Sequence, residues 1–239
     1  MRGVIGAAAF LTAAALAAAP AIAHKTETPN PHRFTGTAAV APRFVGEEQE
    51  LTLKPFVVTC EKAKSTKATP AASFPSSNLA AVVKFGECTA TGTIAKTEYE
   101  LEARVSAITV NYHANGALEM GSGGTIEGGK LVGAGPIKVS MTGAVKCTIS
   151  LAAGAYPAGY GKRPQGEFEA ATFSDNEETL GSGKHERTVG KLEISTELGK
   201  LPYTLEGPFC ETLPKTEMKS GVFTGSLEAS IHDGSIGWE

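Results

Sequence analysis

Apolar and polar residues alternate with a period of two along much of the chain. The alternating apolar positions are Leu51 and Leu53; Tyr99, Leu101, Ala103 and Val105; Ile137, Val139 and Met141; and Val145, Cys147, Ile149 and Leu151. Because successive side chains of a strand point to opposite faces, this pattern predicts half-buried strands. No convincing amphipathic helix follows the first two dozen residues. We therefore predict an all-β fold, an antiparallel β-sandwich of immunoglobulin-like or similar type.

Turn-forming residue pairs separate the predicted strands. They are Asn115-Gly116, Gly128-Gly129, Leu198-Gly199 and Asp233-Gly234. These pairs favour tight connections between antiparallel neighbours. Between Val105 and Ile108 the apolar phase slips by one residue, which predicts a β-bulge there.

Short echoes in the sequence indicate a duplicated β-module. Leu51 precedes Cys60-Glu61 by nine positions, and Leu201 precedes Cys210-Glu211 by the same nine. Two further echoes pair Cys88-Thr89 with Cys147-Thr148 and Phe34–Thr37 with Phe223–Ser226. The echoes predict one module in residues 24–134, with a flexible N-terminal segment, and a second in 135–239. Two domains and one interleaved sandwich both remain open.

Residues 1–23 have the pattern of a cleaved signal peptide. Arg2 supplies a basic start, an apolar run follows from Val4 to Ala19, and Ala21 and Ala23 are the small residues that signal peptidase reads. The run is shorter than the roughly 20 apolar residues of a membrane span. We expect a mature chain that begins at His24, has no transmembrane span, and is secreted or associated with the cell envelope.

Four cysteines lie in the mature chain, and an even number in an exported chain indicates disulfides. No C-x-x-C pair or nearby histidine supports zinc ligation or dithiol redox chemistry. Because each repeat has one Cys-Glu and one Cys-Thr segment, we predict the pairs Cys60–Cys88 and Cys147–Cys210. The main alternative joins like with like, Cys60 with Cys210 and Cys88 with Cys147.

Charge and aromatic content narrow the classes of partner. The formal net charge is −3, which does not favour tracking along a phosphate backbone, so we expect no nucleic-acid partner. Aromatic residues make up 7% of the chain, which supplies few stacking platforms for a sugar.

Three cysteine-containing or aromatic segments resemble those of uncharacterised secreted β-rich bacterial proteins. The segments are Glu87–Ala90, Lys146–Ile149 and Gly221–Ser226. The resemblance implies export, strands and disulfides. It transfers no functional residue to this chain.

Apparent catalytic motifs fail their spacing tests. Gly121–Gly124 contains Ser122 but lacks the first glycine of a nucleophile elbow, and Gly181–Lys184 lacks the first glycine and the hydroxyl of a phosphate loop. We interpret both as loops. Asp175–Glu178 offers oxygen ligands without EF-hand spacing, so an acidic turn is favoured over a weak calcium site near Asp175.

Paired carboxylates and histidines have ordinary explanations as well. Glu98, Glu100 and Glu102, and the pair Glu167 and Glu169, lie two apart and form the polar face of an alternating strand. Histidines beside turns are read as solvated.

We therefore expect an exported structural or adhesive component that contacts an unknown envelope or extracellular partner. No catalytic residue, cofactor or metal is expected. The alternatives are a secreted hydrolase with a site assembled from dispersed residues and a carbohydrate- or lipid-binding β-module.

Overall fold

The computed structural model describes residues 32–37, 41–69, 74–94, 96–127, 130–143, 146–156, 170–180, 187–210, 219–231 and 234–239. All described residues belong to one compact unit, Pro31–Glu239. The predicted signal peptide therefore lies outside the described residues. None of the described segments is a helix with the length and apolar character needed to cross a membrane.

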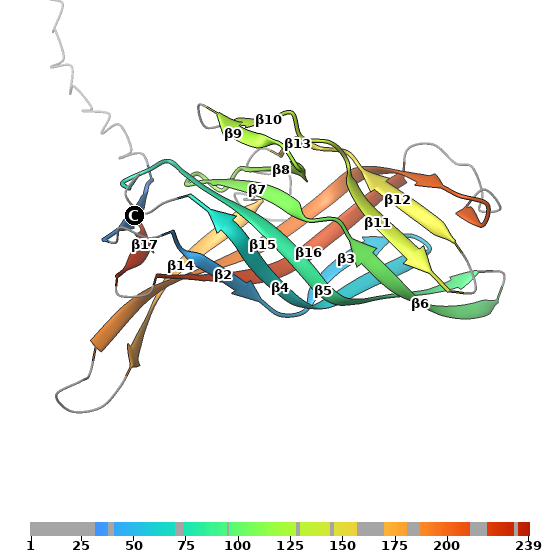
Figure 1. Ribbon diagram of the computed structural model, residues 1–239, viewed down its shortest axis with the longest axis horizontal. Helices are drawn as coiled ribbons and strands as arrows, with labels where there is room; N and C mark the ends of the chain where they lie inside the picture. The colour runs from blue at the N-terminus through green and yellow to red at the C-terminus, as the bar shows by residue number, and fades with distance from the viewer. Residues whose placement is uncertain are drawn as a thin grey trace, which may run out of the picture. The chain divides into compact units, whose positions relative to one another are not determined.

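The described residues form antiparallel strands joined by turns, without an α-helix, so the prediction of an all-β fold is confirmed (Figure 1). In chain order the strands are β1 (Phe34–Gly36), β2 (Arg43–Gly46), β3 (Gln49–Leu53), β4 (Phe56–Ala68), β5 (Asn78–Ile94), β6 (Thr97–Val105), β7 (Ile108–His113), β8 (Leu118–Ser122), β9 (Thr125–Glu127), β10 (Lys130–Val132), β11 (Ile137–Thr142), β12 (Cys147–Leu151), β13 (Gly154–Tyr156), β14 (Ala171–Leu180), β15 (Arg187–Glu206), β16 (Lys219–Ser230) and β17 (Ile236–Trp238).

Strand pairing runs in a closed circuit. From β5 it passes through β6, β11, β12, β15 and β16 to β3 and β4, and β4 pairs with β5 again. The strands β7, β8 and β13 branch from the first half of β5, and β14 pairs with β15. The arrangement is sandwich-like, because the apolar faces of two layers of strands oppose each other. Hydrogen bonds between strands also join the two layers into one sheet.

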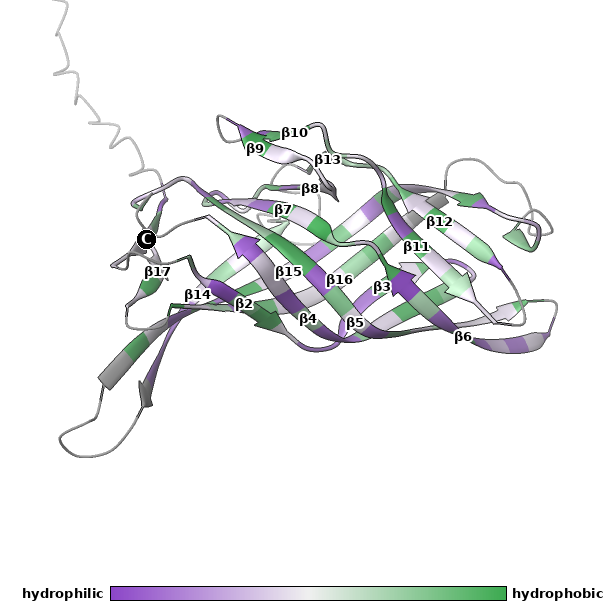
Figure 2. Ribbon diagram, viewed as in Figure 1, coloured by the Kyte–Doolittle hydropathy of each residue, from purple (hydrophilic) through white to green (hydrophobic). Residues whose placement is uncertain are grey.

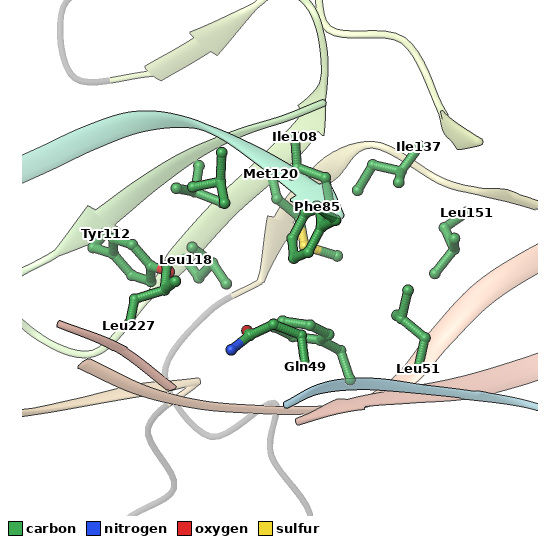
Figure 3. A pocket seen from close by; sticks show the side chains of 13 residues that line it. Gln49, Leu51, Phe85, Ile108, Tyr112, Leu118, Met120, Ile137, Leu151 and Leu227 are labelled. Atoms are coloured by element: carbon green, nitrogen blue, oxygen red, sulfur yellow. The ribbon is translucent and has the colours of Figure 1, made fainter. Parts of the chain in front are cut away.

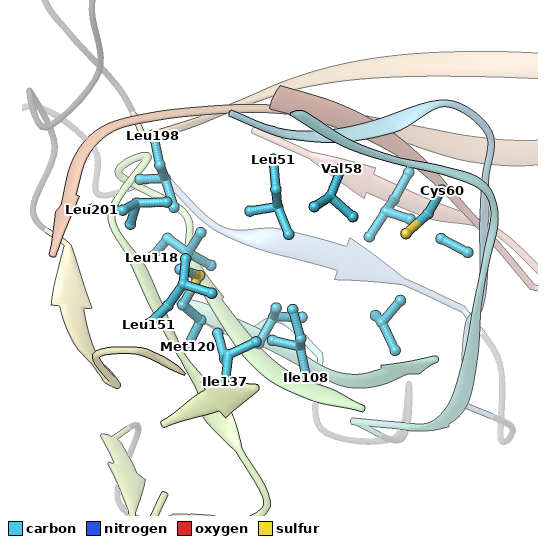
Figure 4. Packing of buried hydrophobic residues seen from close by; sticks show 14 of the residues in the cluster. Leu51, Val58, Cys60, Ile108, Leu118, Met120, Ile137, Leu151, Leu198 and Leu201 are labelled. Atoms are coloured by element: carbon cyan, nitrogen blue, oxygen red, sulfur yellow. The ribbon is translucent and has the colours of Figure 1, made fainter. Parts of the chain in front are cut away.

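The core lies between these opposing faces. Along β11 and β12 the buried and less buried positions alternate, as the sequence pattern predicts. Leu51 and Val58 point across the interior toward Met120 and Ile137 (Figure 4). Figure 2 shows the same alternation of hydrophobic and hydrophilic residues along the strands. Each fully buried aliphatic side chain of this kind stabilises the fold by roughly 1.5–3 kcal/mol.

Two sequence predictions about local structure are wrong. The phase slip after Val105 is a break between two strands: β6 pairs with the second half of β5 and β7 with its first half. The Leu198-Gly199 pair lies inside β15, where the register against β16 shifts between Leu198 and Leu201 and Lys200 takes a positive φ. A bulge absorbs the turn-like residues because β16 continues to pair on both sides of it.

The predicted turn at Asn115-Gly116 is confirmed. Gly116 has a φ of 81°, and the Asn115 side chain accepts a hydrogen bond from the Ala117 N–H at 3.1 Å. Gly128-Gly129 and Asp233 lie outside the described residues.

Strands on either side of the predicted 134/135 boundary pair with one another, as β11 does with β6 and β13 with β8. The echoes also fall in different settings. Leu51 and Cys60 lie on the two strands of a hairpin, whereas Leu201 lies in β15 and Cys210 in the turn that follows it. The echo predicts that Cys210 lies in a strand. This prediction is wrong, because Cys210 lies in the turn after β15. The duplicated module itself stays a prediction.

The first and last described segments are held together. β1 pairs with β17, and the rings of His32 and Trp238 stack with their centroids 4.6 Å apart. The Trp238 indole N–H donates to the Ala114 carbonyl at 2.9 Å. Phe173 packs near both Phe34 and Trp238, so β14 is fixed to the same cluster.

Candidate functional site

All four cysteines are buried and joined in the predicted pairs. Cys60 and Cys88 oppose each other directly in β4 and β5, with Cα atoms 4.0 Å apart. Cys147 in β12 is bonded to Cys210, with Cα atoms 5.4 Å apart. Because each thiol is oxidised and enclosed, these residues hold neighbouring segments together and do not provide a nucleophile or a metal ligand.

The sequence segments read as loops are partly strands. Ser122 is the last residue of β8 and exchanges backbone hydrogen bonds with Gly135, while Gly123 and Gly124 turn with positive φ. Within the described residues no hydrogen bond joins the Ser122 hydroxyl to a histidine. Residues 181–186 lie outside the described residues, so the Gly181–Lys184 motif is not placed.

The prediction of an acidic turn at Asp175–Glu178 is wrong, because these residues lie in β14. Its residues act on neighbouring strands: an Asp175 carboxylate oxygen accepts the Trp238 backbone N–H at 2.8 Å, and Glu178 pairs with Lys191. Among the residues that the structure describes, no three His, Cys, Asp or Glu side chains are placed to hold a metal ion.

Glu98, Glu100 and Glu102 are exposed on the outer face of β6, beside the partly buried Tyr99 and the buried Leu101. This confirms the interpretation of an ordinary polar face. Glu167 and Glu169 lie outside the described residues.

A small apolar cavity lies in the interior (Figure 3). Its volume is about 20 Å³, room for about one water molecule. Its lining is Gln49, Leu51, Val83, Phe85, Ile108, Val110, Tyr112, Leu118, Met120, Ile137, Leu151, Phe223 and Leu227. Ligand sites for small organic molecules have volumes of roughly 300–1,000 Å³. This cavity, lined by described residues, is therefore too small for such a ligand.

Gln49 is the polar member of that lining and is 3% exposed. Its amide donates to the Glu47 carbonyl at 2.9 Å and to the Ser226 carbonyl at 2.7 Å. Gly46 and Gly225 leave the space it occupies, since a Cβ at either position would overlap atoms of Gln49 or Ser226. Gln49 therefore ties the β2–β3 turn to β16 and serves the fold.

A polar cluster that the sequence analysis missed lies on the outer face of β7 and β8. The Asn111 side chain donates to a Glu119 carboxylate oxygen at 3.0 Å, and the same oxygen accepts the Leu131 N–H at 2.8 Å. His113 lies 3.7 Å from that oxygen and is partly buried rather than solvated. The hairpin of β9 and β10 packs against β7 and β8 at this point (Figure 1). Glu119 thus anchors the hairpin.

An open acidic cleft of about 400 Å³ lies between β2 and the strands β14, β15 and β16. Its lining is Val45, Gly46, Glu47, Asn176, Glu193, Ser226, Leu227 and Glu228. Lys191 of β15 forms ion pairs with Glu178 and Glu228, and these hydrogen bonds raise the pKa of Lys191. These pairs cross-link three strands beside the cleft.

The outer face of β2, β4 and β5 carries the opposite charge. We call it the basic face and define it by Arg43, Lys62, Lys64, Lys67 and Lys84, which are all exposed. Lys62 pairs with Glu87, and this hydrogen bond holds the pKa of Glu87 below its ordinary value. The basic face escaped the sequence analysis because its residues come from three strands and are brought together by the sheet register.

The described residues thus offer chemistry on outer faces and a filled apolar interior. The disulfides, Gln49 and Glu119 have structural partners, whereas the basic face is open to solvent. No protein-family model, curated protein or solved structure matches this chain.

Proposed function

We propose that the chain is an exported structural or adhesive component of the cell envelope or the medium, which acts by surface contact and not by catalysis. The observation that carries this proposal is the contrast between interior and surface. The apolar cavity among the described residues, of about 20 Å³, is too small for an organic ligand, while charged groups lie on open sheet faces.

The disulfides support the location outside the cytoplasm. Two buried bridges close chain segments separated by 28 and 63 residues. Bridges of this kind persist in oxidising compartments and are rare in the reducing cytoplasm. They also stabilise a chain that must survive without chaperones after export.

The test adds the mature chain, which we expect to begin at His24, to washed cells of the source organism that do not make the protein. Binding is measured by sedimentation of the cells. Saturable cosedimentation is the expected result, and reduction and alkylation of the disulfides followed by unfolding should abolish it. A folded chain that stays in the supernatant with both cells and envelope fragments contradicts the proposal. N-terminal sequencing of exported material checks the start at His24.

The two alternatives predict different observations. A hydrolase should turn over members of an ester, peptide and glycoside panel, and loss of that activity in Ser122→Ala would overturn the surface-contact proposal. A carbohydrate- or lipid-binding module should bind a neutral sugar or enhance the fluorescence of an aliphatic probe.

A further inference from the structure

The basic face concentrates positive charge in a chain whose net charge is −3. Lys64 of β4 stands directly opposite Lys84 of β5. Ala63 and Val83, the adjacent residues of the same strands, are buried, so the two lysines point to the outer face. Side chains directly opposite on antiparallel strands have Cβ atoms about 5 Å apart, and like charges at this spacing destabilise the sheet.

Neighbouring positions extend the face in both directions. On the other side of Lys64 lies Val45 of β2, and Arg43 is two residues along that strand. Arg43 is exposed and shares the outer face with Val45 because Phe44 between them is fully buried. Alternate residues of one strand are about 7 Å apart and neighbouring strands about 4.8 Å apart. The positive groups therefore form an array across three neighbouring strands.

A bulge in β4 adds Lys67 to this array. The register against β5 shifts between Ser65 and Lys67, so that Lys67 lies opposite Val82. Val82 has the same parity in β5 as Lys84 and shares its face. Without the bulge, the odd-numbered Lys67 would point to the side of the buried Ala63.

The charges of this array are largely uncompensated. Lys62 pairs with Glu87, but Arg43, Lys64, Lys67 and Lys84 form no ion pair with any residue that the structure describes. A repulsive lysine pair inside an array of open positive charge points to an anionic partner.

The lysine side chains and the breadth of the sheet face favour one kind of anionic partner. Lysine heads on flexible stems act as point charges and suit several distributed anionic groups better than one bidentate group. The face lacks exposed aromatic rings among its defining residues, so it offers no stacking platform for single-stranded bases. A face that spans three strands is also too broad for the major groove of a duplex, which admits a helix or a two-stranded ribbon. A flexible chain with a negative group on each repeat unit fits this array.

We propose that the basic face binds a linear anionic polysaccharide, and this proposal rests on the surface-contact function above. The polymer lies across β2, β4 and β5 with its negative groups near Arg43, Lys64, Lys67 and Lys84. Because these contacts are exposed, salt weakens them.

The test compares two double variants of the full mature chain for binding to alginate, a polyuronate, by calorimetry. Lys64→Glu with Lys84→Glu reverses the centre of the basic face. Lys130→Glu with Lys138→Glu makes the same change in net charge on exposed positions of β10 and β11. Each lysine near a polyanionic surface contributes roughly a fivefold factor in affinity, so the first variant should bind roughly 30-fold more weakly or worse. The control should change affinity less than about twofold.

Two further measurements keep the result specific. Neutral dextran should not bind. Lys64→Gln with Lys84→Gln, which only removes the charges, should weaken alginate binding to a smaller extent than the charge reversal does.

Lys84→Glu alone should raise the thermal unfolding midpoint, since it replaces a repulsive cross-strand pair with an attractive one, and should lower the affinity for alginate. This opposition between stability and binding is not expected of a purely structural lysine.

Equal weakening in both charge-reversal variants, or no weakening in the first, overturns the proposal. Tighter binding of duplex DNA than of alginate at the same site also overturns it, in favour of a nucleic-acid partner. If the unaltered chain still sediments with cells while alginate binding is independent of Lys64 and Lys84, this inference fails and the surface-contact function stands.

Discussion

Cys60 and Cys88 are paired residues of the β4–β5 ladder as well as the two halves of a disulfide. The bridge therefore joins two strands that backbone hydrogen bonds already hold in register. Its effect must come largely from the unfolded chain, whose freedom it restricts. The Cys147–Cys210 bridge instead fixes the turn after β15 to β12, and it encloses the longer segment.

We predict that the two bridges contribute unequally to stability. Closing loops of 28 and 63 residues stabilises the folded state by about 3.6 and about 4.3 kcal/mol, on the chain-entropy model. Cys147→Ala with Cys210→Ala should therefore lower the free energy of unfolding more than Cys60→Ala with Cys88→Ala. Urea denaturation under nonreducing conditions measures both. The opposite order would show that loop entropy does not govern these bridges.

Nonreducing peptide mass spectrometry should find Cys60 linked to Cys88 and Cys147 linked to Cys210. In Cys210→Ser, Cys147 should become a free thiol while the first bridge survives. A peptide that links Cys60 to Cys210 would contradict the pairing.

Gly46 should not tolerate a side chain. A Cβ there would lie 2.3 Å from the Ser226 carbonyl oxygen and 2.7 Å from Leu227, so the backbone of β2 or β16 must move. We expect Gly46→Ala to lower the free energy of unfolding by about 1–3 kcal/mol. Gly154→Ala is the matched control, because no atom lies within 4 Å of its added Cβ. Equal stability of the two variants in denaturant titrations would argue against the close approach at Gly46.

Loss of the Glu119 carboxylate should release the hairpin of β9 and β10. The side chain is 13% exposed, and it accepts hydrogen bonds from Asn111 and from the Leu131 backbone. Glu119→Ala should cost about 1.5–3 kcal/mol, because it removes a charged acceptor from partly buried donors. Amide hydrogen exchange should accelerate at Leu131 and stay unchanged in β11. Unchanged protection at Leu131 would refute the anchoring role.

Two buried tyrosines should make the fold sensitive to high pH. Burial raises the pKa of Tyr112 and of Tyr203 to about 12, above the ordinary value of about 10 that applies in the unfolded chain. Between these values the unfolded chain loses phenolic protons that the folded chain keeps, so the free energy of unfolding should fall as the pH rises from about 10 to about 12. Below pH 10 this contribution is complete.

Tyr203→Phe separates the two tyrosines. It removes the hydrogen bond to the Lys54 carbonyl, 2.8 Å long, and should cost about 1 kcal/mol at neutral pH. It should also make the alkaline loss of stability less steep, as measured by urea denaturation at a series of pH values. An unchanged slope would mean that Tyr203 does not contribute to it.

Alternation predicts strands where one face meets the core and the other meets solvent, as along Ile137, Val139 and Met141. It also locates β7, whose Ile108, Val110 and Tyr112 are in the core, but the alternate residues Thr109 and Asn111 are buried and not exposed to solvent. The pairing of Cys60 with Cys88 was predicted correctly from the echoes, although those echoes occupy different structural settings. The sequence shows locally only the run Lys62, Lys64 and Lys67 of the basic face, because Lys84 joins Lys64 only through the β4–β5 register.

The closed circuit of strands also constrains how the chain acquires its structure. The Gln49 side chain bonds to Ser226, 177 residues further along, and β2 and β3 find their last partner only when β16 is present. Contacts of such long range make folding slow, and the circuit cannot close while the C-terminal part is still being synthesised. Until then the edges of β2 and β3 stay open to other chains. Passage through an export channel needs an interval in which the chain remains unfolded, so slow closure of this topology is compatible with the export that we propose.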